Sequence, residues 1–107
     1  MIFKVIYSTD AQRNLHEIRA YIHDVLREPQ TAQKQLRRII KAVRGLDQLP
    51  FRHRTYEHEP WRSLGFRSFP VDNYLIIYLP NEDAQTVTVA HIIYGARDIP
   101  AQLEETE

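Results

Sequence analysis

Residues 63–94 read SLGFRSFPVDNYLIIYLPNEDAQTVTVAHIIY, and this stretch decides the fold class. It contains three runs rich in β-branched and aromatic residues, at 63–69, 73–79 and 86–94, and turn-forming segments separate them. Short, turn-rich connections join neighbouring strands as antiparallel hairpins. The middle run is apolar on both faces, as expected of a central strand covered on one side and partly on the other. The stretch therefore predicts three consecutive antiparallel strands.

The residues before this stretch predict one further strand and two helices. The run 2–7 alternates as a strand does, and Thr9 followed by Gln12 is a capping-box pattern that opens a helix. Glu28-Pro29 separates the two helices, because the residue before a proline is disfavoured in the helical conformation. Both helices carry apolar residues at steps of three and four: Ala11, Leu15, Ile18, Ile22 and Val25, then Ala32, Leu36, Ile39, Val43 and Leu46.

The predicted order is β-α-α-β-β-β, an α+β fold. A helical hairpin packs on one face of a small, mainly antiparallel sheet, and we expect the other sheet face to be free for function. A chain of 107 residues predicts a single domain over 1–107, with 102–107 as a mobile tail.

Composition limits the classes of protein that this chain can represent. It has no cysteine, which excludes disulfides and thiolate metal sites. The histidine spacings form no metal site, so we expect no metal and no cofactor. No run approaches the roughly 18 apolar residues of a membrane span, and the start lacks the pattern of a signal peptide. We therefore expect a cytoplasmic protein.

Charge is distributed unevenly along the chain although the formal net charge is zero. Residues 34–67 contain nine Lys or Arg against three acids, a net charge of +6, and the remainder carries −6. Such segregation favours an anionic partner for the middle of the chain. The alternative is that many of these charges belong to ordinary solvated helix faces.

The ordered motifs LGFRSFPVDNYLIIY (64–78) and VTVAHIIYGARDI (87–99) on this short chain resemble the RelE/ParE superfamily of toxins from type II toxin–antitoxin modules. The resemblance covers residues 1 to about 100 and implies a toxin neutralised by an antitoxin encoded beside it. RelE-like members are metal-independent ribonucleases that cleave mRNA on the ribosome, whereas ParE-like members poison DNA gyrase. The fold is common to both, so the residues must discriminate between them.

Metal-free RNA cleavage by a 2′-hydroxyl needs a base, an acid and a cation for the developing phosphorane charge. Arg67 matches the arginine that contacts the scissile phosphate in RelE-like relatives, and Arg97 resembles the basic residue that follows their last strand. Strand alternation places Tyr94 on the open face and His91 on the helix-covered face. His58 is our choice for the base. Each of these residues has an alternative role: Arg67 as a solvated arginine on an exposed sheet face, Arg97 as a partner in a salt bridge, and Tyr94 as a half-buried aromatic residue that covers the sheet.

Two further sets of residues complete the expected surfaces. Basic and aromatic side chains interleave in 51–62, a pattern that suits RNA, and the expected RNA-binding residues are Arg52, Arg54, Arg62 and Trp61. The expected antitoxin-binding residues are Lys34, Arg37, Arg38, Lys41 and Arg44.

The sequence favours a ribosome-dependent mRNA endonuclease, because of the basic middle segment and the expected open-face arginines. A gyrase inhibitor is the alternative, since no lysine follows Lys41 and no general base is evident. A catalytically inactive interaction module is a minor third possibility.

Overall fold

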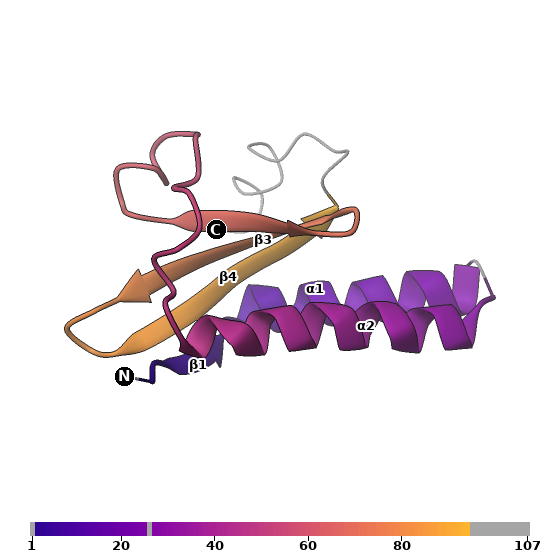
Figure 1. Cartoon of the computed structure of the whole chain (residues 1–107). Helices are drawn as coiled ribbons and strands as arrows, with labels where there is room; N and C mark the ends of the chain where they lie inside the picture. Colours follow the sequence, from indigo (N-terminus) through magenta and orange to yellow (C-terminus); the bar gives the residue numbers. More distant parts are fainter. Residues whose placement is uncertain (1, 26, 95–107) are drawn as a thin grey trace.

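Two helices and four strands form the α+β fold that the sequence predicts. The computed structural model describes residues 2–25 and 27–94. Arg97 and the tail 102–107 lie outside the described residues. Both helices lie on the same side of the sheet (Figure 1). The elements are β1 (Lys4–Tyr7), α1 (Thr9–Ala20), α2 (Pro29–Arg44), β2 (Arg67–Val71), β3 (Tyr74–Asn81) and β4 (Thr86–Tyr94).

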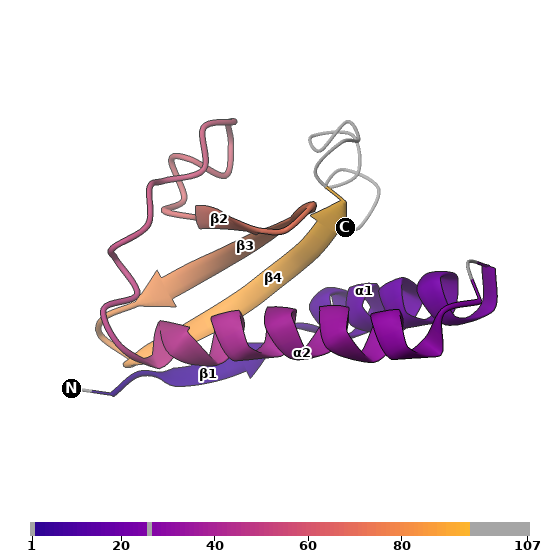
Figure 2. The same ribbon diagram turned by 45° about the vertical axis from the view of Figure 1, so that its right-hand side comes forward.

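The four strands are ordered β1-β4-β3-β2 in one sheet. β2 pairs with β3 and β3 with β4 in antiparallel fashion, whereas β1 pairs with β4 in parallel. After β1 the chain forms the helical hairpin and then returns to the sheet as β2, β3 and β4. The first strand therefore lies beside the last one (Figure 2). The sheet is therefore mainly antiparallel, as predicted.

Ser8, one residue before the predicted position, caps the start of α1. Its backbone is extended, and its Oγ accepts a hydrogen bond from the Ala11 amide at 3.0 Å. The same hydroxyl donates to the carbonyl of Ala90 in β4 at 2.7 Å. Gln12 does not complete a capping box with Thr9; its side-chain amide donates to the Tyr7 carbonyl at 3.2 Å. Ser8 thus joins the start of α1 to the last strand.

α1 ends earlier than the sequence predicts. A π-helical turn, Tyr21–Val25, follows it and brings the chain toward α2. Pro29 occupies the first turn of α2, where its missing amide hydrogen costs nothing. A 3-10 turn, Gly45–Asp47, ends this second helix.

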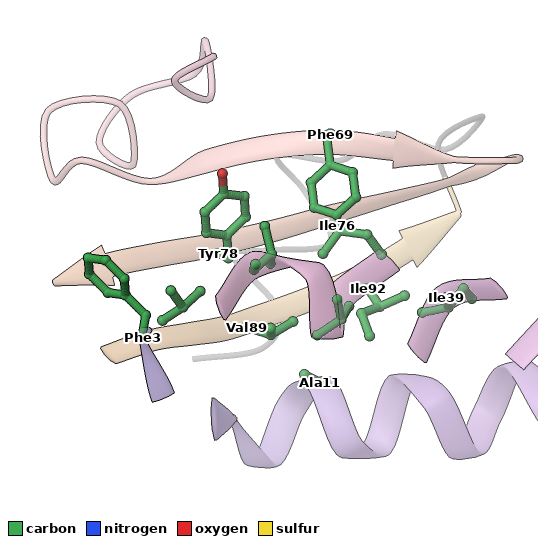
Figure 3. Close-up of a cluster of buried hydrophobic side chains, with 11 residues drawn as sticks. Phe3, Ala11, Ile39, Phe69, Ile76, Tyr78, Val89 and Ile92 are labelled. Carbon is green, nitrogen blue, oxygen red and sulfur yellow. The ribbon is translucent and has the colours of Figure 1, made fainter. Parts of the chain in front are cut away.

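The predicted apolar stripes of both helices meet the sheet in the main core (Figure 3). Ile39 and Val43 of α2 are fully buried against Ile76, Val89 and other strand residues. Tyr78 also lies in this core, with its hydroxyl directed away from α1 in Figure 3. Because these strand residues contact helices, they define the helix side of the sheet.

A β-bulge in β4 changes which residues face the helices. Ile77 pairs with His91 but Tyr78 pairs with Val89, so Ala90 is an extra residue in the ladder. The extra residue inverts the alternation that follows it. His91, expected to face the helices, therefore shares the opposite face with Ile77.

The same inversion corrects the prediction for Tyr94. Ile92 rather than Ile93 joins the main core, and Tyr94 pairs with Tyr74, which packs against that core. Residues directly opposite in a ladder lie on one face of the sheet. Tyr94 therefore lies on the helix side, and not on the open face that simple alternation predicts.

The sheet face away from the helices is not free, contrary to expectation. Residues 54–66 fold over it, where Tyr56, Ile77 and Ile93 are buried together and Trp61 and Phe66 pack against them. The predicted strand 63–69 begins only at Arg67, because 60–65 form turns. In 2–25 and 27–94, no helix is long and apolar enough to cross a membrane.

Candidate functional site

Arg67, the strongest sequence candidate, is bound to the backbone of a neighbouring loop. Its Nη1 donates to the carbonyls of Phe51 at 3.1 Å and His53 at 2.6 Å. Its guanidinium carbon lies 5.1 Å from the centroid of the Phe51 ring, within range of a cation–π interaction. Arg67 pairs with Tyr78 and so lies toward the helix side rather than on an open sheet face. This arginine fastens residues 51–53 to the start of β2.

Arg52, an expected RNA-binding residue, also donates hydrogen bonds to backbone carbonyls. Its Nη1 donates to the carbonyls of Gly45 at 3.3 Å and Leu49 at 3.2 Å, and also to that of Gln48. Carbonyls at the end of a helix lack partners within the helix, and a guanidinium satisfies several of them at once. Arg52 therefore closes the turn that follows α2.

Tyr78 binds the same loop at Pro50. Its hydroxyl donates to the Pro50 carbonyl at 2.6 Å in a buried contact. Burial raises the pKa of Tyr78 to about 12, although Arg67 and Arg52 act in the opposite direction. From the sequence Tyr78 is recognisable only as a strand residue, since its contact is with a backbone carbonyl that no side-chain motif reveals.

His53 lies in an aromatic environment beneath this loop. Its ring stacks on Phe69 with centroids 4.2 Å apart and 12° between the planes, and it meets Tyr78 edge-on. Its Nε2 is buried and has no hydrogen-bond partner among the described residues. Burial lowers the pKa of His53, and the neighbouring Arg52 lowers it further. Because its Nε2 is enclosed, His53 is poorly placed to take a proton from a substrate.

Of the remaining expected residues of the basic loop, His58, Arg54 and Arg62 are exposed and Trp61 is half-buried. His58 lies near the Tyr56 ring, with its Nε2 4.0 Å from the Glu57 carboxylate. Arg54 and Arg62 are exposed and form no ion pair with any described residue. Trp61 is half-buried against Tyr56 at a centroid distance of 6.1 Å, so its ring covers the sheet.

Two acidic residues, Glu57 and Glu59, lie among the basic residues of 51–62. Glu59 accepts hydrogen bonds from the amide and hydroxyl of Ser63 at 2.8 and 2.7 Å, and these bonds lower its pKa. Glu57 is exposed beside His58. The loop is therefore mixed in charge rather than a continuous cationic surface.

The structure does not bring Arg67 and Tyr94 together. Their partners on β3 are Tyr78 and Tyr74, four residues apart, which corresponds to about 13 Å along a strand. Tyr94 is 43% exposed and meets Tyr74 edge-on at 5.8 Å. Arg67 and Tyr94 are therefore separated along the sheet and Arg97 lies outside the described residues, so one phosphate site formed by these three residues stays a prediction. The catalytic roles themselves stay predictions.

His91 lies near charged residues of α1. Burial lowers its pKa, the Asp10 carboxylate raises it and Arg13 lowers it. Arg13 itself forms ion pairs with Asp10 and Glu17. In the part of the chain that the structure describes, no three histidine, cysteine or acidic side chains gather to hold a metal ion.

A cationic helix face is the clearest charged feature. α2 contains no acidic residue, and its five basic side chains are all exposed. Of these only Arg38 has an ion pair within the described residues, to Asp72 at 3.4 Å. The other four, which we name the basic stripe, are Lys34, Arg37, Lys41 and Arg44. Like charges at spacings of three and four weaken a helix, so this stripe has a cost in the isolated chain.

A mainly apolar groove of about 480 Å³ lies beside this stripe. It is lined by Ile6, Tyr7, Gln12, Leu15 and Ile40 from β1, α1 and α2. Ile6 and Ile40 are 39% and 37% exposed. Burial raises the pKa of Tyr7 while Arg44 lowers it, which places the end of the stripe close to the groove. Apolar contact and positive charge are thus available together.

Comparison with known proteins identifies the family. The sequence matches the family model of the ParE toxin of the type II toxin–antitoxin system parDE over residues 5–99. No curated protein matches the chain.

Three solved structures have a similar fold. A chain of the chromosomal ParDE toxin–antitoxin system from P. aeruginosa has a TM-score of 0.71 and 18% identity, covering 87% of this chain and 96% of that one. One from the toxin–antitoxin complex RelBE2 of Mycobacterium tuberculosis has a TM-score of 0.65 and 20% identity, covering 91% and 95%. The isolated E. coli RelE toxin gives 0.55 and 8%, covering 97% and 96%.

Proposed function

The chain belongs to the ParE toxin family of type II toxin–antitoxin systems, and from this premise we propose that it arrests growth by poisoning DNA gyrase. The sequence resembles the RelE/ParE superfamily, and this resemblance implies gyrase poisoning if the chain acts as a ParE-like member. Ribonuclease activity, which the sequence analysis favoured, becomes the second candidate.

The observation that carries the proposal is the state of Arg67. Its guanidinium donates to two backbone carbonyls and stacks on Phe51, and it is separated from Tyr94 along β3. A nuclease site needs donors that converge on the position where charge develops. The two bonds of Nη1 hold the guanidinium against its own loop, which makes it less available for bidentate contact with a phosphate. The arrangement therefore supports a toxin that acts by binding.

Purified gyrase provides the test. We expect the toxin to inhibit supercoiling or to trap gyrase–DNA cleavage complexes, while primer extension on mRNA after induction detects no new ends. Metal-independent cleavage of mRNA, leaving a 2′,3′-cyclic phosphate and a 5′-hydroxyl, would instead establish the ribosome-dependent nuclease. Arg54 and Arg62, which are exposed and form no ion pair with any described residue, favour that second candidate.

A cognate antitoxin is the second partner that we propose. The apolar groove and the basic stripe suit a segment that carries both apolar and acidic residues. Coupled folding of such a segment gives fast, salt-sensitive association. Arg38, also expected to bind antitoxin, is held by Asp72 and is the less available of the five.

Charge reversal tests this assignment. Lys41→Glu should weaken antitoxin binding and reduce its dependence on salt, while Arg62→Glu, which lies outside the groove and stripe, serves as the matched control. Equal losses in the two variants would contradict a specific role for the stripe.

A further inference from the structure

Three exposed apolar residues lie on two neighbouring segments, the residues before β1 and the loop that follows α2. Leu49 is 74% exposed, Ile2 70% and Phe51 43%. The Phe3 amide donates to the Asp47 carbonyl at 2.8 Å, and the Phe3 ring meets Phe51 edge-on at 6.3 Å. These contacts hold the start of the chain beside the loop. We name Ile2, Leu49 and Phe51 the loop patch.

Leu49 has an unusual backbone conformation. Its φ is +49°, in the left-handed region that favours glycine and asparagine. Of the non-glycine residues at positive φ in 2–25 and 27–94, it is the only apolar one. Its side chain gains little burial in return for this strain, since the residue is 74% exposed. A strained residue that directs an apolar group into solvent is a reason to look for a binding role.

The loop is fixed in this conformation by contacts already described. Arg52 donates to the Leu49 carbonyl, Tyr78 to the Pro50 carbonyl and Arg67 to the Phe51 carbonyl. A loop that is ordered before binding avoids the entropy cost of ordering on association. Apolar and aromatic anchors within a polar rim are the usual centres of protein interfaces.

The rim of the loop patch is cationic. Arg52 is exposed, and Arg67 lies over the Phe51 ring. Arg54, two residues further along, is exposed with no ion pair to any described residue. Complementary charge speeds association and selects partners. The partner that fits is a protein with an apolar pocket bordered by carboxylates.

We propose that the loop patch is the surface by which the toxin binds its protein target. The inference rests on the proposed function in taking gyrase as the target to be tested. It shares no residue with the groove or the basic stripe, so target and antitoxin contacts can be separated by mutation.

Leu49→Asn and Leu49→Gly remove the apolar side chain and suit a positive φ, so both variants should fold. Leu64→Asn is the matched control, because Leu64 is 63% exposed in a different loop. We expect both Leu49 variants to lose growth arrest and to bind purified gyrase about tenfold or more weakly, as hot-spot residues do. Their unfolding midpoints and antitoxin affinity should match the wild type, and Leu64→Asn should remain toxic.

Three results would overturn the inference. The first is full toxicity of folded Leu49→Asn. The second is a loss of antitoxin affinity equal to the loss of toxicity. The third is a wild-type dimer that Leu49→Asn converts to a monomer, since the loop patch would then join two copies of the chain. If wild-type protein leaves gyrase unaffected and both Leu49 variants still lose growth arrest, the gyrase proposal fails while the loop patch keeps its role against another protein target.

Discussion

Replacing Arg67 with alanine should destabilise the fold, whatever it does to activity. The change removes two hydrogen bonds from a charged donor, to the carbonyls of Phe51 and His53, and a cation–π contact with the Phe51 ring. Hydrogen bonds to charged groups contribute roughly 1.5–3 kcal/mol each and an exposed cation–π contact roughly 0.5–1 kcal/mol. Since water can reach part of the site, we expect a loss of about 2–4 kcal/mol in the free energy of unfolding.

Chemical denaturation measures this loss directly. In a thermal scan it corresponds to roughly 10–30 °C for a domain of this size. Arg54→Ala is the matched control, because Arg54 is an exposed arginine of the same segment without an ion pair to the described residues, and it should stay within about 0.5 kcal/mol of the wild type. Arg67→Lys should fall between the two, since one ammonium does not reproduce the guanidinium geometry.

Equal unfolding free energies for Arg67→Ala and Arg54→Ala would refute this reasoning. Arg67 would then be an unconstrained surface arginine, available for phosphate as the sequence suggests. If the loss is confirmed, reduced toxicity of Arg67→Ala reports on folding and on the loop it holds, and does not identify a catalytic residue.

Three further predictions concern caps, tyrosine and pH. Ser8→Ala should cost about 1 kcal/mol or more, as the loss of an N-cap does, whereas Thr9→Ala should be nearly neutral in the same denaturation assay; the reverse order would restore the capping box. Tyr78→Phe should cost about 1–2 kcal/mol through its lost hydrogen bond, and the absorbance change of tyrosine ionisation near pH 12 should shrink. Burial lowers the pKa of His53 and His91, so the unfolded chain binds more protons than the folded one as the pH falls. The contribution of these two histidines to stability is therefore complete above about pH 6.5 and declines below it. Replacing both with glutamine should flatten that decline between about pH 7 and 5.

The fold was predictable because its main signals are periodic. The stripes containing Ile39 and Val43 fixed α2, and β4 begins and ends at the residues that the sequence predicts. The β-bulge at Ala90 was not predictable, since a run of β-branched and apolar residues looks regular with or without an extra residue. That single residue is the reason why the faces of His91 and Tyr94 were assigned wrongly.

The candidate site was harder to predict because its arginines bind backbone. Every residue has a backbone carbonyl, so no sequence motif identifies the carbonyls that accept hydrogen bonds from Arg52 and Arg67. The folding of 54–66 over the sheet was also missed, although Tyr56, Trp61 and Phe66 provide the apolar surface for it. A segment rich in aromatic residues can cover its own sheet as readily as it can stack on RNA.

The pairing of β1 with β4 has a consequence for synthesis of the toxin. The Ser8 hydroxyl donates to the carbonyl of Ala90, 82 residues further along the chain, so neither the sheet nor this link between α1 and the sheet is complete until β4 exists. At about 5–20 residues per second, that interval lasts roughly 4–16 s of translation. Until β4 is made, the helices lack Val87, Val89 and Ile92, the residues that this strand contributes to the main core. A nascent chain that stops before Thr86 should be harmless and open to proteases, and the antitoxin need only be present when the last strand emerges.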